Sequence, residues 1–117
     1  MRILLVDVPG TTRAATASWL EMVQGVETVE VATSGVEALQ LLGNGAPPHV
    51  VLVDSQLADI SVFEFVRRAK ARWLAPKVVI MARVLTERLL AAARAAGADH
   101  GIEKISLQKE LPRLLVG

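Results

Sequence analysis

The run His49-Val50-Val51-Leu52-Val53-Asp54 constrains the fold most, because four successive aliphatic residues end abruptly on a carboxylate. An apolar run without polar alternation is typical of a strand that is buried on both faces, as in a parallel sheet covered by helices. Its last residue, Asp54, would then lie at the carboxyl edge of the sheet, where ligands bind in open α/β folds. The rest of the chain must therefore supply further strands and two layers of helices.

Strand-like runs alternate with helical patterns along all 117 residues. We expect strands at 3–6, 26–32, 50–54, 78–81 and 98–104. We expect helices at about 13–24, at 34–42, from residue 61, at 85–96 and from residue 106. Five such units predict one α/β domain, residues 1–117, with a flavodoxin-like, doubly wound, five-stranded parallel sheet of order 2-1-3-4-5 between five helices in two layers.

Two helix starts carry the capping-box pattern, in which a serine is followed three residues later by a glutamate. These pairs are Ser34 with Glu37 and Ser61 with Glu64. In the helix that opens at Ser61, the helical spacing predicts one apolar face. That face would consist of Phe63, Val66 and Ala69-Lys70.

Glycine and proline predict where helices end. Gly25 and Gly97 follow helical patterns and are expected as C-terminal stops. Ser106 is expected to cap the last helix, and Pro112 inside it is expected to end or kink it, since proline lacks the backbone N–H.

Composition excludes several classes of function. The formal net charge is +1 and no basic stripe is present, so nucleic-acid binding is not expected. The chain has no cysteine, which excludes disulfides and thiolate metal sites and suits a reducing compartment. The apolar start Ile3–Val6 is broken by Asp7 and is too short to span a membrane, so we expect a cytoplasmic protein or a domain of a longer one.

Two carboxylates are predicted to meet at the carboxyl edge. In the order 2-1-3-4-5 the first and third strands are neighbours at the topological switch point, and they end at Asp7 and Asp54. Lys104, at the end of the fifth strand, would reach the same crevice. Paired carboxylates suit Mg²⁺ together with a phosphate oxygen, and lysine suits a phosphate. This set would let an aspartate accept a phosphoryl group, although either aspartate taken alone is more often a turn residue.

The chain resembles response-regulator receiver domains over essentially its whole length. The resemblance rests on residues 3–7 with Arg13, on 32–39, on the Asp54 strand, on Gly97-Ala98-Asp99 and on Lys104. It implies that Asp54 is phosphorylated by a sensor histidine kinase or phosphotransfer partner, that Lys104 contacts the phosphoryl group, and that Asp7 belongs to the Mg²⁺ site together with Asp54. It also implies an effector domain or partner protein that receives the signal.

Several positions depart from the family pattern. The second acid of the Mg²⁺ site falls on Val8, and the hydroxyl residue that ends strand four falls on Ala82, or on Met81 with a shift of one residue. The switch aromatic falls on Gly101, and the proline after the lysine is Ile105. The proline and glycine that follow the acceptor strand are Ala58 and Val62.

These departures predict an atypical receiver with a degenerate pocket. Val8 removes an anionic ligand, so Mg²⁺ binding and phosphorylation of Asp54 should be weak or absent. Without a hydroxyl at Ala82 the switch loses its partner. In a second hypothesis, Lys104 pairs directly with Asp54 or Asp7, with Arg83 adding charge nearby, and this ion pair fixes one conformation.

Other classes of function remain as alternatives. The strongest is a pseudo-receiver that acts as a protein–protein interaction module without phosphorylation. The stretch from Asp7 to Thr11 faintly resembles the nucleophile loop of haloacid-dehalogenase-type phosphatases, but Pro9 replaces its second acid, so no enzyme is expected. A flavodoxin-like phosphate loop is disfavoured by Asp7. The alanine-rich stretch 89–96 suggests a homodimer or partner surface on the face of the fourth helix, fifth strand and fifth helix.

Overall fold

A computed structural model describes residues 1–73 and 76–116. The strands are β1 (Arg2–Val6), β2 (Thr28–Ala32), β3 (Val50–Asp54), β4 (Lys77–Ala82) and β5 (His100–Glu103). The helices are α1 (Thr11–Met22), α2 (Gly35–Leu42), α3 (Val62–Arg72), α4 (Glu87–Ala96) and α5 (Leu107–Val116), and a 3₁₀ turn, η1 (Lys104–Ser106), precedes α5. None of the described helices is long and apolar enough to cross a membrane.

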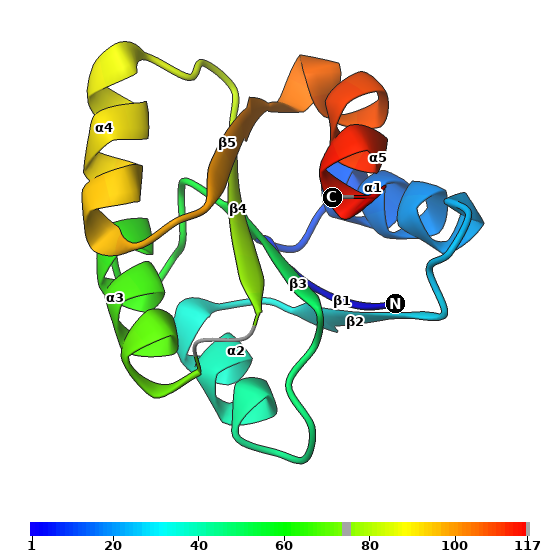
Figure 1. Ribbon diagram of the computed structural model, residues 1–117, viewed down its shortest axis with the longest axis horizontal. Helices are drawn as coiled ribbons and strands as arrows, with labels where there is room; N and C mark the ends of the chain where they lie inside the picture. The colour runs from blue at the N-terminus through cyan, green and yellow to red at the C-terminus, as the bar shows by residue number, and fades with distance from the viewer. Residues whose placement is uncertain (74–75, 117) are drawn as a thin grey trace.

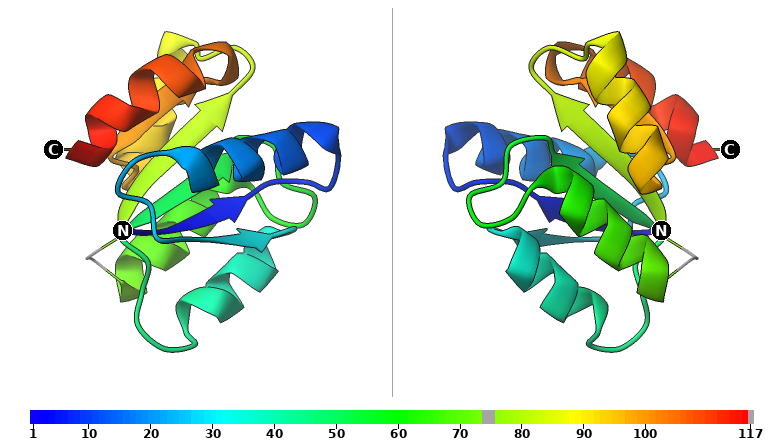
Figure 2. Two further views of the ribbon diagram at one scale, coloured as in Figure 1. Left: turned by 90° about the vertical axis from the view of Figure 1, so that its right-hand side faces the viewer. Right: turned by 90° about the vertical axis from the view of Figure 1, so that its left-hand side faces the viewer.

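The five strands form one parallel sheet of order β2-β1-β3-β4-β5, which confirms the predicted topology. Helices α1 and α5 cover one face of the sheet, and α2, α3 and α4 cover the other (Figures 1 and 2). β3 lies at the centre, hydrogen-bonded to β1 and β4, and all five of its residues are buried. The continuous aliphatic run that ends on Asp54 therefore has the doubly covered position that its sequence predicts.

The core consists of two aliphatic layers, one on each side of the sheet. Alternate residues of each strand point to opposite layers, so Leu4 and Val6 pack beneath α2 and α3, whereas Ile3 and Leu5 pack beneath α1 and α5. Phe65 is the largest fully buried side chain and lies in the α2–α3 layer. With so few aromatic residues, packing of Val, Leu, Ile and Ala holds the strand ends in place.

The prediction for the apolar face of α3 was wrong at two positions. Val62, Phe65, Val66 and Ala69 form the buried face, whereas Phe63 is only half-buried and Lys70 pairs with Asp99. The reason is that a helix starting at Val62 turns Phe65 into the core, and the two phenylalanines lie about 200° apart on a helix with 3.6 residues per turn.

The ends of α5 also differ from expectation. Ser106 belongs to η1, which runs directly into α5, and does not occupy a separate capping position. Pro112 does not end the helix, which continues to Val116. Leu107 and Leu111 before the proline are buried against the sheet, and Leu114 and Leu115 after it pack partly buried on the same cluster. This packing stabilises the helix on both sides of the proline.

Two helix boundaries also differ slightly from the predicted ones, and a capping contact explains the second. α1 lies two residues earlier than expected, ending at Met22 before Gly25. α4 begins at Glu87 and not at Leu85, because the side chain of Thr86 accepts a hydrogen bond from the backbone N–H of Leu89 at 3.0 Å. Gly97 ends α4 in the left-handed conformation, with φ of 116°, as its position in the sequence predicts.

Both predicted serine caps are present, but neither glutamate accepts from the backbone N–H of its capping serine among the hydrogen bonds of the described residues. Ser34 and Ser61 each accept from the backbone N–H three residues on, at 3.1 Å. Glu37 reaches back to the backbone N–H of Thr33, whereas Glu64 pairs with two arginines of its own helix. The hydrogen bond from Thr33 to Glu37 therefore connects the start of α2 to the residue after β2, at the carboxyl edge of the sheet.

The two phenylalanines of α3 provide a test of this core assignment. We expect Phe65→Ala to lower the free energy of unfolding by about 3–4 kcal/mol, since it leaves a cavity in the α2–α3 layer. The matched variant Phe63→Ala should cost clearly less, because Phe63 is only half-buried. Urea unfolding followed by circular dichroism measures both, and equal losses would contradict the assignment.

Candidate functional site

Three polar side chains from distant parts of the chain meet at the carboxyl edge of the sheet. Asp7 follows β1, Asp54 ends β3, and Lys104 follows β5. β1 and β3 are neighbours, and β4 separates β3 from β5, so the three strand ends surround one crevice. The structure thus brings together the residues that the sequence placed there.

Lys104 contacts the Asp54 carboxylate directly. Its Nζ lies within ion-pair distance of Asp54 Oδ2 and 4.0 Å from Asp7 Oδ2. Both carboxylates are almost fully buried, at 2% and 5% exposure. Burial makes the ammonium important, because an uncompensated carboxylate in this position would be strongly destabilising.

The remaining carboxylate oxygens accept hydrogen bonds from the backbone. Asp7 Oδ1 accepts from the N–H of Val8 at 2.8 Å, and Asp54 Oδ1 accepts from the N–H of Gln56 at 2.9 Å. The loops after β1 and β3 therefore fix the orientation of each carboxylate. Asp54 Oδ2 and Asp7 Oδ2 face the ammonium of Lys104.

Asp7 is the electrostatically perturbed member of the group. The pKa of Asp7 is raised to about 6, chiefly by burial and in addition by the hydrogen bond and negative charge of Asp54. Lys104 and the N–H of Val8 act in the opposite sense. The pocket therefore holds more negative charge than one lysine neutralises, and it favours an additional proton or cation.

The donor set available to a metal ion is limited to these two carboxylates. Among the described residues no group of three or more His, Cys, Asp or Glu side chains is placed to hold a metal. Two carboxylates meet the minimum that Mg²⁺ uses when water and a phosphate complete its six ligands. Asp7 and Asp54 are the residues that would hold it.

Four of the departing positions lie in or next to β1, β4 and β5. Val8 follows Asp7 directly and its side chain is 40% exposed. Ala82 is buried at the end of β4, and Gly101 lies in β5. Ile105 is 91% exposed, in η1 next to Lys104. None of these four side chains can donate a hydrogen bond or bind a cation.

A groove beside Asp54 contains residues that the sequence did not assign to the site. Asp54 and Lys104 line it together with Phe63 from α3 and Arg83 and Val84 from the β4–α4 loop; the other lining residues are Ser55, Gln56, Ala82 and Leu89. The part of the groove wall that Ala82 and Val84 form is apolar. No pattern in the sequence indicated that Phe63 lines this groove, because its helical spacing predicted a position in the core.

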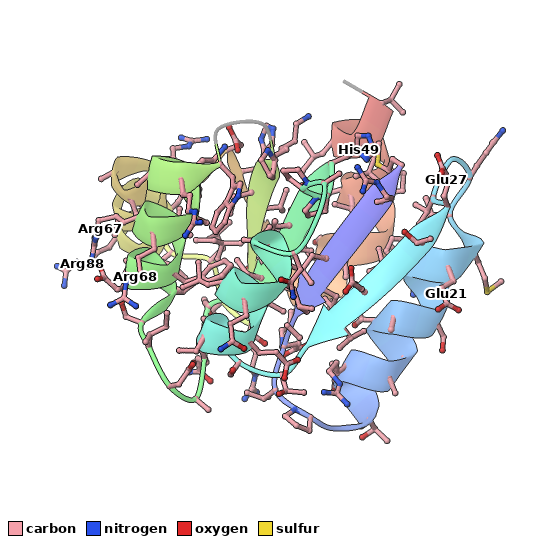
Figure 3. The ribbon with its side chains drawn as sticks, turned by 90° about the horizontal axis from the view of Figure 1, so that it is seen from below. Glu21, Glu27, His49, Arg67, Arg68 and Arg88 are labelled. Atoms are coloured by element: carbon pink, nitrogen blue, oxygen red, sulfur yellow. The ribbon has the colours of Figure 1, made fainter. Side chains whose placement is uncertain are left out.

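The two histidines and most charged side chains lie away from this edge. His49 Nδ1 accepts from the N–H of Arg2 at 2.9 Å, which places it at the amino ends of the strands. Figure 3 shows Arg67, Arg68 and Arg88 at the α3–α4 side of the molecule, and Glu21 and Glu27 at the α1–β2 side. At the carboxyl edge, Lys104 forms the ion pairs with Asp7 and Asp54, and Arg83 and Glu103 lie nearby on the β4–α4 loop and at the end of β5.

Comparison with protein families gives one clear match. The family model for the response regulator receiver domain matches residues 3–115. No curated protein matches the chain in sequence.

Solved structures give many matches over nearly the full chain. A CheY-like response regulator receiver protein from Methanospirillum hungatei is 28% identical, with TM-score 0.79, over 98% of this chain and 86% of that one. A LuxR-family two-component response regulator from an Aurantimonas species is 25% identical, with TM-score 0.88, over 98% and 81%. A chain from the complex of the CheA3 P1 domain with CheY6 of R. sphaeroides is 24% identical, with TM-score 0.81, over 99% and 97%.

The raised pKa of Asp7 predicts how Asp7→Asn alters stability with pH. In the unfolded chain this carboxyl has its ordinary pKa of 3.8, and in the folded protein its pKa is about 6. Its contribution to stability is therefore fully present below pH 3.8 and is lost as pH rises through 6. Relative to the natural protein, Asp7→Asn should gain about 1–3 kcal/mol at pH 8 and nearly nothing at pH 4.

Urea unfolding of both proteins from pH 4 to pH 8 measures this difference. The control is Glu21→Gln on the exposed surface of α1, which should show no such pH dependence. A constant difference between Asp7→Asn and the natural protein over this range would contradict the assignment.

Proposed function

Because the chain belongs to the response regulator receiver domain family of two-component systems, we propose that Asp54 is its phosphoryl acceptor and that the acceptor is weak. The single observation that carries the proposal is the geometry at the carboxyl edge. Asp54 is held by Lys104 and lies beside Asp7, but neither Val8 nor Ala82 adds a polar group. Asp54 and Lys104 are thus present. The second carboxylate for Mg²⁺ at position 8 and the hydroxyl group at position 82 that would respond to the phosphoryl group are absent.

The proposed reaction is an in-line phosphoryl transfer. One carboxylate oxygen of Asp54 attacks the phosphorus of a phosphohistidine or small phosphodonor and forms an acyl phosphate. The bond from phosphorus to the donor atom breaks, and the leaving group keeps the electron pair and takes a proton from solvent. Lys104 lies where its ammonium would neutralise charge on the transferred phosphoryl oxygens.

Two features of this pocket oppose the reaction. Asp54 Oδ2 is engaged by Lys104, so the attacking carboxylate must first loosen this contact. In this family the acidic pocket commonly binds Mg²⁺, which supplies positive charge to the transferring group. Here only Asp7 and Asp54 would hold the ion, because Val8 offers no carboxylate, and Mg²⁺ dehydrates reluctantly without strong ligands.

The response to phosphorylation is also reduced in the proposal. A phosphoryl group on Asp54 would face the end of β4, where Ala82 carries only a methyl group. A methyl group cannot hydrogen-bond to a phosphoryl oxygen, so a modified Asp54 has no side chain of β4 to attract. Signal transfer requires an element whose conformation the modification biases.

The partners in this proposal are those of the family. Receiver domains interact with histidine kinases or phosphotransfer proteins and with effector domains. We propose a sensor histidine kinase or a phosphotransfer protein as the donor, and a role for this chain as a cytoplasmic acceptor, not as an enzyme. The exposed Ala91 and Ala95 of α4, together with β5 and α5, form the proposed surface for a homodimer or output partner.

A second candidate function is a phosphorylation-independent interaction module. The observation that favours it is the contact between Lys104 and Asp54, which gives the acceptor carboxylate a cationic partner without any phosphoryl group. In this alternative the three charged residues serve only to stabilise the carboxyl edge.

The experiment is intact-mass measurement after incubation with acetyl phosphate and Mg²⁺. We expect a small fraction of the natural protein to gain one phosphoryl group and Asp54→Asn to gain none. Val8→Asp should increase the phosphorylated fraction and lower the Mg²⁺ concentration that is required by on the order of tenfold or more, because it adds a metal ligand at an exposed position.

Two outcomes separate the candidates. Rapid, stoichiometric phosphorylation of the natural protein would refute a weakened acceptor site. No mass gain in either the natural protein or Val8→Asp would refute the acceptor role and favour the interaction module.

A further inference from the structure

The loop between β4 and α4, residues 83–86, is tied to the neighbouring strand by a side chain of β5. Glu103 Oε2 accepts a hydrogen bond from the backbone N–H of Leu85 at 2.9 Å. Glu103 is the last residue of β5 and lies beside Ala82, the last residue of β4. A half-buried carboxylate is thus used to hold a loop backbone 18 residues away in sequence.

Apolar packing holds the same loop from its other side. A Cβ atom placed on Gly101 would lie 3.0 Å from Leu90 Cδ1 and 3.2 Å from Leu85 Cδ1. These distances are shorter than ordinary van der Waals contact, so the two leucines occupy the space above β5 that a side chain at position 101 would need. Leu85 is therefore anchored through both its backbone and its side chain.

The anchored loop continues into a capped helix start. Thr86 caps α4 through its contact with the N–H of Leu89, and the backbone N–H of Leu90 donates to the Thr86 carbonyl at 3.0 Å. Arg83 and Val84, which precede Leu85, line the groove beside Asp54 and Lys104. The conformation of the loop therefore determines where Arg83 and Val84 form one wall of the groove. It also determines where the first turn of α4 begins.

We propose that Glu103 is a positioning residue which, with Leu85 and Leu90 packed over Gly101, holds the β4–α4 loop and the start of α4 in one conformation in the unmodified protein. The groove wall at Arg83 and Val84 is then preformed, and the α4–β5 surface is presented whether or not Asp54 is phosphorylated. The inference goes beyond the proposed function, and it does not depend on whether Asp54 accepts a phosphoryl group.

Amide hydrogen exchange of Leu85 in the intact protein tests the hydrogen bond. Glu103→Ala removes the acceptor, so exchange at Leu85 should accelerate by about 10- to 100-fold, the range expected for loss of a hydrogen bond to a charged group. Glu103→Gln retains a carbonyl oxygen at this position and should stay within a few-fold of the natural protein.

Two controls separate positioning from general stability. Glu110→Ala removes an exposed carboxylate from α5 and should leave the Leu85 amide unchanged. Exchange at Leu52 in the central strand should be equal in all variants. The proposal is overturned if Leu85 exchanges at the natural rate in Glu103→Ala, or if Leu52 accelerates in parallel with it.

A steric test examines the packing independently. Gly101→Leu should lower the melting temperature by several degrees, because the new side chain meets Leu85 and Leu90. In a Leu85→Ala background the same substitution should cost clearly less, since space has been made. Equal losses in the two backgrounds, or no loss in either, would show that the leucines do not fill this space.

Discussion

The contact of the Lys104 ammonium with two buried carboxylates is the interaction on which the carboxyl edge of this protein depends. Asp7 and Asp54 are carried into the same crevice by neighbouring strands, and burial, together with the hydrogen bond and negative charge of Asp54, raises the pKa of Asp7 to about 6. Lys104 is the cation of the described residues that lies within ion-pair distance of both. The parallel sheet brings two carboxylates close together, and the ammonium of Lys104, the residue after β5, largely offsets their repulsion.

The same crevice explains why the family assignment and the expected chemistry diverge. The acceptor aspartate and its lysine require only the positions of strand ends, which the fold preserves. In the proposed function, the groups that are missing belong to single positions, Val8, Ala82 and Gly101. Ala82 is buried at the end of β4, and leucines from the β4–α4 loop and α4 fill the space above Gly101. The proposed loss of response is therefore compatible with an intact five-stranded sheet.

Sequence alone predicted the strand order and the meeting of Asp7, Asp54 and Lys104, because continuous aliphatic runs and chain topology determine where strand ends lie. It failed where a side chain depends on the rotation of a helix or on distant partners. In α3 the buried residues Val62, Phe65, Val66 and Ala69 share one helical face, whereas the prediction placed Phe63 there in place of Phe65. The hydrogen bond between Glu103 and the Leu85 backbone could not be predicted from the sequence, because hydrogen bonds between a strand and a separate loop leave no periodic pattern of residues. Pro112 does not end α5, which was one of its two predicted effects, because tertiary packing outweighs its helix-breaking tendency.

The most direct measurement of the central claim is a double-mutant cycle on Lys104 and Asp54, using urea unfolding at pH 7.5. Lys104→Ala should lower the free energy of unfolding by about 1–3 kcal/mol, because it leaves two buried carboxylates without their cation. In an Asp54→Asn background the same substitution should cost much less, since only one carboxylate then needs compensation. Equal costs in the two backgrounds, or no cost in either, would contradict the claim that this contact holds the carboxyl edge together.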